Sequence, residues 1–258
     1  MAFWDDLYRQ SQSVTVDEEA LTATQLHHDL SQFAVVDVSE SDWVASPAKG
    51  VLRLLLERDG GEKTTRATSL VAYQPNSRFE SHGHPRGEEF VVLSGTFSDE
   101  HGDYPAGTYV RNPPGSSHQP FSRDGCLILV KLQQFDLGDD QHIVETLSAS
   151  KHVSESVGGW SQQVLFEGYE NVSFMQSNES RIIPVEWLQL GVEMLVISGG
   201  LTMIEAAGEA YHAEGSWLRF PACSNEYFTV DIVAEKNTQL WIKTRHLPEM
   251  LILDRNSE

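Results

Sequence analysis

Residues 81–95 have the sequence SHGHPRGEEFVVLSG. His82 and His84 lie two positions apart, so on an extended strand both imidazoles face the same side. Gly87 can adopt a positive φ and close a tight turn after them. Glu88 then begins the next strand and can return a carboxylate to the same side. The pattern predicts a metal site built on β-hairpins.

A second stretch, GTYVRNPPGSSH at residues 107–118, ends on another histidine. Its rigid Pro-Pro-Gly turn would start a strand on which His118 points inward. Three imidazoles and one carboxylate suit zinc, iron, manganese or nickel, and are too nitrogen-rich for calcium or magnesium. Adjacent strand residues face opposite ways, so only one of Glu88 and Glu89 can be a ligand. The predicted metal ligands are His82, His84, Glu88 and His118.

Short segments rich in Val, Leu, Thr and aromatic residues flank these stretches, separated by Gly, Pro, Asn and Asp clusters. They predict strands over residues 50–57, 68–73, 90–93, 108–111 and 127–133. Many short strands favour an antiparallel sandwich or barrel, so an all-β fold with little helix is expected. One short helix is predicted over residues 17–31, with His27 and His28 as surface residues near its end.

The second half of the chain repeats ordered landmarks of the first. The matched pairs are Glu88 with Glu193, Gly95 with Gly200, Gly107 with Gly215, Pro113 with Pro221, His118 with Glu226, Lys131 with Lys243 and Trp43 with Trp160. The spacing between partners grows slowly along the chain, as loop-length changes between duplicated domains produce. Two copies of one β-fold are therefore predicted.

The second copy lacks the histidines. Counting back from Glu193 places Trp187 and Gln189 where the histidines of the first stretch stand, and Glu226 takes the place of His118. Trp cannot ligate a metal and Gln is a poor ligand for a transition ion, so this copy is predicted to be metal-free. The predicted segments are a polar and helical extension (1–35), a metal-binding domain (36–140), a linker (141–159) and a degenerate domain (160–258).

Composition excludes several classes of protein. The 38 acidic against 18 basic residues give a formal net charge of −20, which would repel a nucleic-acid backbone. The N-terminus lacks the basic and apolar segments of a signal peptide, and no apolar run is long enough to span a membrane. Cys126 and Cys223 form neither a C-x-x-C pair nor a disulfide framework. A cytoplasmic protein is expected.

Several other polar and aromatic residues are expected to be solvated or packed in the core and to lie outside the metal site. Arginines in such turns are usually solvated, which is the expectation for Arg86 and Arg111. Core packing is expected for Tyr73, Tyr104 and Tyr109. A solvated hairpin tip is expected for Asp99, Glu100, His101 and Asp103. His212 is expected in a turn or on the surface.

These spacings resemble the two motifs of the cupin superfamily. The first, G-x5-H-x-H-x3,4-E-x6-G without its leading glycine, is matched by His82, His84, Glu88 and Gly95. The second, G-x5-P-x-G-x2-H-x3-N with Ser122 in the place of the asparagine, is matched by Gly107, Pro113, Gly115 and His118. The spacing to Gly95 favours Glu88 over Glu89 as the ligand. Residues 87–104 look like the ChrR-type cupins, which are named for the C-terminal domain of a zinc-containing anti-sigma factor.

The resemblance implies a bicupin of two tandem jelly-roll barrels with one divalent transition metal, zinc ranking before iron, and manganese or nickel also suitable. It implies a sensory or regulatory protein, or one that binds a small molecule. The alternative is a non-haem metal-dependent dioxygenase acting on a diketone or aromatic ketone, and the sequence leaves open whether the protein is an enzyme. The residues before the cupin contain no cysteine, so the Cys/His anti-sigma zinc motif is missing and sigma-factor binding is not expected. A homodimer is expected by analogy.

Overall fold

The computed structural model describes residues 2–16, 24–61, 66–148, 157–223 and 230–249. Within these residues almost all regular elements are strands; the α-helices are α1 (Ala2–Ser11) and α2 (Val185–Gln189). The elements form two compact units, the first from residues 1–28 and 38–148 and the second from residues 29–37 and 149–258. The predicted all-β class with little helix is confirmed. None of the helices in the described part of the chain has the length and apolar character to cross a membrane.

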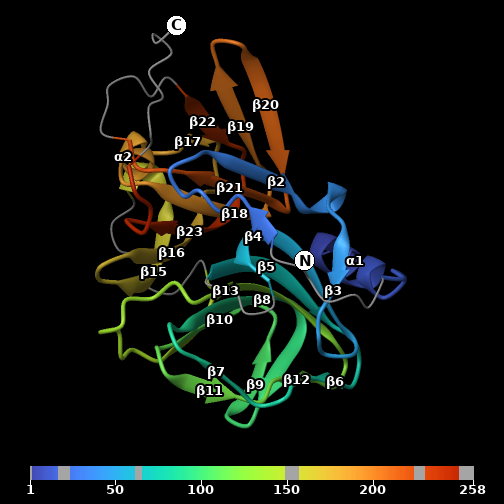
Figure 1. Cartoon of the computed structure of the whole chain (residues 1–258). Coiled ribbons are helices and arrows are strands. Elements are labelled where there is room, and N and C mark those ends of the chain that lie inside the picture. The colour runs from blue at the N-terminus through green and yellow to red at the C-terminus, as the bar shows by residue number, and fades with distance from the viewer. Residues whose placement is uncertain (1, 17–23, 62–65, 149–156, 224–229, 250–258) are drawn as a thin grey trace, which may run out of the picture. The chain divides into compact units, whose positions relative to one another are not determined.

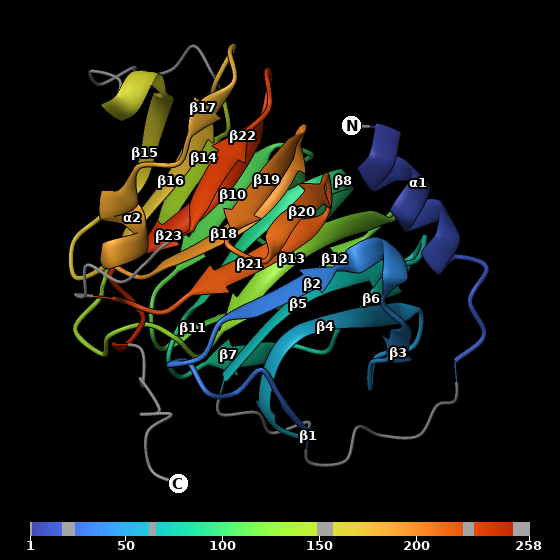
Figure 2. The ribbon, with the colours of Figure 1, turned by 90° about the horizontal axis from the view of Figure 1, so that it is seen from above.

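The first unit is built on one large antiparallel sheet (Figures 1 and 2). Its strands pair in the order β1 (Thr24–Leu26), β4 (Val51–Gly60), β5 (Arg66–Tyr73), β13 (Cys126–Leu132), β8 (Glu88–Asp99), β10 (Thr108–Asn112) and β14 (Ile143–Thr146). Short strands extend it: β3 (Trp43–Ala45), β6 (Ser77–Arg78), β9 (Gly102–Pro105) and β12 (Phe121–Ser122). All five segments predicted as strands lie in strands of this sheet; four have small shifts at their ends, while the segment predicted over residues 90–93 is part of the longer strand β8.

A separate two-stranded pair, β7 (His82–His84) and β11 (Ser116–His118), lies below β13, β8 and β10 in Figure 1. The inward-facing side chains of the large sheet form an apolar core that includes Phe90, Phe97, Tyr104 and Ile128. Alternation along each strand sends every second side chain to this interior. His118 on β11 contacts the Phe97 ring of this core, with the ring centroids 5.9 Å apart, so the pair β7–β11 carries its histidines at the border of the core.

The second unit contains a six-stranded and a four-stranded sheet. The six strands pair in the order β15 (Ser161–Glu167), β16 (Asn171–Gln176), β23 (Gln239–Thr244), β18 (Val192–Ser198), β21 (Ser216–Phe220) and β2 (Ala34–Asp37). The four are β17 (Arg181–Ile182), β22 (Asp231–Ala234), β19 (Gly200–Glu205) and β20 (Gly208–Ala213). Strand β2 lies beside β21 in Figure 2, so a segment from the N-terminal region completes this sheet. The boundaries placed at residues 35, 140 and 159 stay predictions.

The helix predicted over residues 17–31 is wrong for the part that the structure describes. Residues 24–26 form β1, which pairs with β4, while residues 17–23 lie outside the described residues. The helix of this region is α1, which buries Trp4, Leu7, Tyr8 and Ser11. This spacing of three and four residues is the usual signature of an amphipathic helix, and it was present in the sequence.

The internal repeat is real, but its register differs by one residue from the prediction. Glu89 on β8 lies opposite Arg111 and Lys131 on its two neighbouring strands. Glu193 on β18 lies opposite Arg219 and Lys243 in the same way. Glu193 is therefore the counterpart of Glu89 and not of Glu88.

The turn glycines and the tryptophans follow the corrected register. Gly95 and Gly199 both have positive φ, 71° and 80°, which makes Gly199 and not Gly200 the counterpart of Gly95. Trp43 lies in β3, which pairs with β4, whereas Trp160 directly precedes β15. These two tryptophans therefore do not hold equivalent positions.

Candidate metal centre

Three histidine side chains converge where β7 meets β11. His82 lies directly opposite His118 in the antiparallel register, and His84 lies opposite Ser116. The centroids of the three imidazole rings are 4.9 to 5.1 Å apart. One ring nitrogen from each lies within 4.8 Å of the other two. His82 and His84 therefore face the same side, as strand alternation predicts, and His118 points toward them as expected.

Glu88 brings a carboxylate to the same place. Gly87, at φ 75°, makes the turn after β7, and its amide donates to the carbonyl of His84 at 3.1 Å. A Cβ on Gly87 would lie 2.1 Å from the Phe135 ring, so only glycine fits this turn. Glu88 Oε2 then lies 3.5 Å from Nε2 of His84 and 3.5 Å from Nε2 of His118. All four predicted ligands thus lie together.

The histidine nitrogens at this site fit a metal ion. Nε2 of His84 and Nε2 of His118 are buried and have no hydrogen-bond partner among the residues that the structure describes. Leaving a buried polar atom unsatisfied costs about 1–3 kcal/mol, so two of them at one point require an explanation. Both atoms face the Glu88 carboxylate, which would offset the charge of a divalent cation. Nitrogen and carboxylate donors of this kind suit a transition ion.

In His82 and His118, the second ring nitrogen, Nδ1, forms a hydrogen bond. His82 Nδ1 donates to the carbonyl of Glu80 at 2.9 Å, which leaves Nε2 as the lone-pair nitrogen. His118 Nδ1 donates to Asp99 Oδ2 at 3.2 Å. Partners of this type fix the tautomer and the ring orientation of ligating histidines. Asn112 Nδ2 likewise donates to Glu88 Oε2 at 3.2 Å.

Asp99 is the site residue that sequence reasoning missed. It was expected in a solvated hairpin tip, but only 8% of it is exposed. Its Oδ1 accepts the backbone amide of His101 at 2.8 Å and the Tyr104 hydroxyl at 3.3 Å, while Oδ2 faces His118. The expectation was wrong because the turn folds back onto β11. No local signal distinguishes such an aspartate from an ordinary turn residue.

Burial and charge move the pKa values of the two buried histidines in opposite directions. Burial is the largest influence on His84 and lowers its pKa, against the attraction of Glu88. Burial also disfavours the charged form of His118, but the hydrogen bond to Asp99 and the attraction of Glu88 outweigh it and raise its pKa. Burial and Asp99 together raise the pKa of the Tyr104 hydroxyl to about 12, so it stays a donor.

Glu89 faces the other side of β8, away from the histidines. Its Oε2 accepts the Tyr109 hydroxyl at 2.8 Å and lies 3.6 Å from Nη1 of Arg111. Arg111 was expected to be solvated, and this was wrong. It is fully buried, forms an ion pair with Asp139 and stacks on the Phe135 ring at 3.7 Å. The second face of the sheet thus has its own buried ionic cluster, separate from the metal ligands.

A cavity of about 490 Å³ opens beside the four ligands, all of which line it. Its other walls are mostly apolar, from side chains of β5 and β13 such as Val71, Ile128, Val130 and Leu132. Of the tyrosines expected in the core, Tyr73 lines this cavity. Concave, apolar sites with a few polar groups are where proteins bind small molecules. The metal ligands are therefore accessible to a ligand of that kind.

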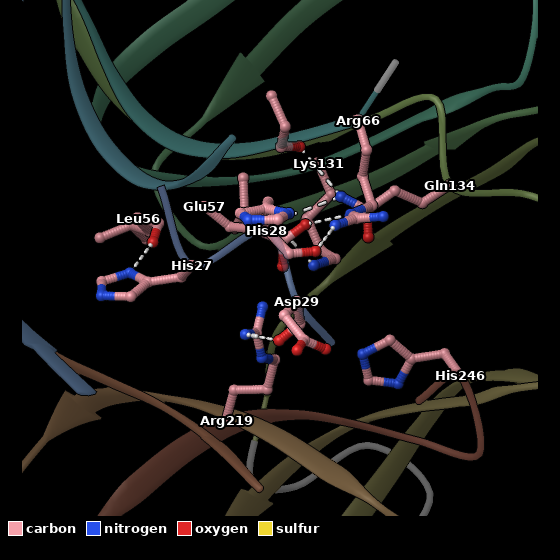
Figure 3. A network of polar contacts seen from close by, with 12 residues as sticks. His27, His28, Asp29, Leu56, Glu57, Arg66, Lys131, Gln134, Arg219 and His246 are labelled. Atoms are coloured by element: carbon pink, nitrogen blue, oxygen red, sulfur yellow. Dashed lines mark hydrogen bonds and ion pairs between the residues drawn. The ribbon is translucent and has the colours of Figure 1, made fainter. Parts of the chain in front are cut away.

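The other histidines singled out in the sequence lie elsewhere. His27 Nδ1 contacts the carbonyl of Leu56 at 2.7 Å, and the His28 carbonyl accepts Nη2 of Arg66 at 2.5 Å (Figure 3). These contacts reach β4 through Leu56 and β5 through Arg66. His212 is half-buried within β20 and not in a turn. These residues are not part of the site.

The second unit carries no equivalent histidine cluster among the residues that the structure describes. Trp187 and Gln189 lie in the short helix α2, and Trp187 packs into the apolar core of this unit. Glu226 lies outside the described residues. Glu193 accepts the indole N–H of Trp217 at 2.8 Å and contacts His246 at 3.0 Å.

Comparison with known proteins agrees with this description. Residues 31–136 match the family model of the ChrR cupin-like domain. No curated protein matched the chain in the sequence comparison. Among solved structures, the protein Ylba from E. coli has a TM-score of 0.59 at 13% identity, over 87% of this chain and 94% of that one.

Two further structures show the same fold. A cupin 2 conserved barrel domain protein from Leptotrichia buccalis has a TM-score of 0.54 at 11% identity, over 86% of this chain and 99% of that one. The bacterial pirin YhhW from E. coli, in complex with nickel(II), has a TM-score of 0.56 at 12% identity, over 85% of this chain and 100% of that one. At such low identity these likenesses establish the fold alone, and they confirm the cupin architecture.

Proposed function

We propose that the protein holds one divalent transition metal and binds a small molecule beside it, since residues 31–136 match the family model of the ChrR cupin-like domain. The ligands are the three histidines of β7 and β11, together with Glu88. The observation that carries this proposal is the pair of buried Nε2 atoms, on His84 and His118, that face one carboxylate and have no hydrogen-bond partner in the described part of the chain.

The donor set narrows the choice of metal. Three neutral imidazoles and one carboxylate match zinc and iron(II), with manganese and nickel also suitable. Nickel(II) is bound in the pirin structure that shares the fold. When bound, the ion would supply Lewis acidity, or redox chemistry if it is iron. Asp99 would hold the tautomer of His118, and Asn112 would orient Glu88.

The cavity favours a functional metal over a purely structural one. Structural sites are closed by their protein ligands, whereas sites that bind substrates keep an open side. Here all four ligands line a cavity of about 490 Å³. Two roles use such a site: ligand sensing, which needs only binding, and oxygenation, which needs iron and turnover. The open cavity is the observation that keeps the dioxygenase as the second candidate.

Metal analysis of the purified full-length protein by mass spectrometry tests the proposal. We expect about one zinc or iron per chain. His118→Ala should remove it, and the matched control Glu89→Gln, on the other face of the same strand, should retain it. A stoichiometry near zero in the wild type, or loss in Glu89→Gln with retention in Glu88→Gln, would contradict the ligand set.

The same samples separate the two roles. Iron with oxygen uptake that depends on an added diketone or aromatic ketone identifies a dioxygenase. Zinc, with no turnover on such a panel, identifies a binding or sensory protein. An oxygen electrode and calorimetry on one preparation give both results.

A further inference from the structure

Strand β5 forms one wall of the cavity beside the candidate metal ligands. Every second residue of it lines the cavity, as strand alternation requires: Ala67, Ser69, Val71 and Tyr73. The neighbouring strand β13 continues this wall with Leu132, Val130 and Ile128, which lie opposite Ala67, Ser69 and Val71. The wall is therefore mostly apolar, and Tyr73 adds to it an aromatic ring that carries a hydroxyl.

Two phenylalanine rings connect Tyr73 to the histidines. The Tyr73 ring contacts the rings of Phe79 and Phe97 edge to face, with centroids 6.1 and 5.5 Å apart. Phe79 also contacts the ring of His82, at 5.6 Å, and Phe97 contacts the ring of His118, at 5.9 Å. One aromatic side chain thus separates Tyr73 from each of these two histidines, and contacts with two rings hold its own ring in place.

The hydroxyl of Tyr73 differs from those of the other buried tyrosines in the first unit. The hydroxyls of Tyr8, Tyr104 and Tyr109 each donate a hydrogen bond to a carbonyl or carboxylate oxygen. Tyr73 is only 4% exposed, yet its hydroxyl forms no hydrogen bond with the residues that the structure describes. Buried tyrosine hydroxyls usually have a partner, because an unsatisfied buried donor destabilises the fold. Tyr73 therefore presents a donor that a bound molecule can use.

This hydroxyl keeps its proton. Burial raises the pKa of Tyr73 well above its usual 10.0, and the interactions with Cys126 and Glu88 raise it further. A ligand that enters the cavity excludes water from the donor, so it must supply an acceptor or leave a buried polar group unsatisfied. A carbonyl oxygen is such an acceptor, and it brings no further donor that an apolar wall would leave without a partner.

We propose that Tyr73 is a ligand-binding residue of this site, whose hydroxyl donates a hydrogen bond to a carbonyl oxygen of a small and otherwise apolar molecule. The apolar body of that molecule lies against β5 and β13. The cavity volume of about 490 Å³ is in the range of small-molecule sites. This inference deepens the proposed function and rests on it for the role of the metal, but the class of ligand follows from Tyr73 and the apolar wall.

Titrations of the purified full-length protein, followed by fluorine NMR, test this role. The probes are 4-fluoroacetophenone, 4,4′-difluorobenzophenone and 4-fluorophenyl cyclohexyl ketone, each with the alkene in which a methylidene group replaces the carbonyl oxygen. The two members of a pair have nearly the same shape, so the ratio of their affinities reports on the oxygen. The protein is treated with a chelator, because a bound metal would also attract the ketone.

Tyr73→Phe removes the hydroxyl and keeps the ring. For at least one pair, the ratio of ketone to alkene affinity should fall about fivefold or more from wild type to Tyr73→Phe. The reason is that the alkene leaves the hydroxyl unsatisfied in the wild type, and the ketone leaves its oxygen unsatisfied in the variant. Thermal unfolding should give nearly the same midpoint for both proteins, because the variant loses no hydrogen bond within the described residues.

Tyr109→Phe is the matched control. It makes the same chemical change on the other face of the sheet, where the Tyr109 hydroxyl donates to Glu89 at 2.8 Å. Tyr109 does not line the cavity, so this variant should leave the ratio of ketone to alkene affinity unchanged.

The results separate this inference from the metal proposal. A fall of the ratio in chelator-treated Tyr73→Phe supports the role of Tyr73 even if metal analysis finds no ion. An unchanged ratio, an equal fall in Tyr109→Phe, or no binding of any ketone would overturn it, even if one metal per chain is found. A clear loss of thermal stability in Tyr73→Phe would also overturn it, since the hydroxyl would then have a partner inside the fold.

Discussion

The main sheets of the two units carry equivalent residues on one face and different residues on the other. On the shared face, the cluster of Glu89, Tyr109, Arg111 and Lys131 has its counterpart in Glu193, Trp217, Arg219 and Lys243. In both, a buried glutamate accepts a hydrogen bond from an aromatic side chain, at 2.8 Å in each case. This pattern belongs to the fold.

The opposite face differs between the units. Glu88 lies opposite Asn112 and Leu132, and its counterpart Val192 lies opposite Phe220 and Thr244. Beyond it, the first unit has a cavity edged by histidines, and the second has an apolar core that contains Trp160 and Trp187. Two neighbouring residues of β8 thus have different roles: Glu89 belongs to a buried cluster found in both units, and Glu88 is a candidate metal ligand of the first unit alone.

Disrupting the buried cluster around Glu89 or around Glu193 should destabilise the unit that contains it and leave metal binding unchanged. We expect Glu89→Gln and Glu193→Gln each to lower the free energy of unfolding by about 3 kcal/mol, because each removes the charge from a buried cluster. Chemical denaturation measures the loss, and metal analysis provides the control. A loss below about 0.5 kcal/mol in both variants would show that the clusters do not stabilise the fold.

Asp99 tests the face that carries the candidate metal ligands. It would affect the metal only through its hydrogen bond with His118. Asp99→Asn should weaken metal affinity about 10- to 100-fold, the usual effect of removing a partner of a ligating histidine. Competition with a chromophoric chelator measures this affinity. The control is Asp103→Asn, since Asp103 is 57% exposed in its side chain and contacts Arg123. Equal affinity in wild type and Asp99→Asn would remove Asp99 from the site.

The pH dependence of metal binding should carry the signature of His118. The pKa of His118 is raised above its ordinary value of 6.5, so protonation of His118 stabilises the metal-free fold below pH 6.5. This stabilisation is lost as the pH rises through the raised pKa. A ligating imidazole must be neutral, so metal affinity should begin to fall already above pH 6.5 as the pH is lowered. In Asp99→Asn the onset should move to lower pH. An unchanged onset would contradict the role of this hydrogen bond.

The sequence predicted that the four candidate ligands lie together, because the signal for their placement is local. The spacing of His82 and His84, the turn at Gly87 and the strand start at Glu88 are all set by alternation within a few residues. The strands were found for the same reason. The register of the repeat was off by one residue because Glu88 and Glu89 are adjacent, and only the pairing with Arg111 decides which one matches Glu193.

The rest depends on contacts distant in sequence. The burial of Arg111 depends on Asp139, 28 residues away, and Asp99 faces His118 across 19 residues. The pairing of β2 with β21 joins segments about 180 residues apart. Local patterns carry no information on such pairs.

Anomalous diffraction from crystals of the metal-loaded protein would locate the metal and identify its ligands. We expect one peak per chain, coordinated by Nε2 of His82, His84 and His118 and by the carboxylate of Glu88, with an open side toward the cavity. A peak in the second unit, or a peak in the first unit with Glu89 in place of Glu88, would contradict it.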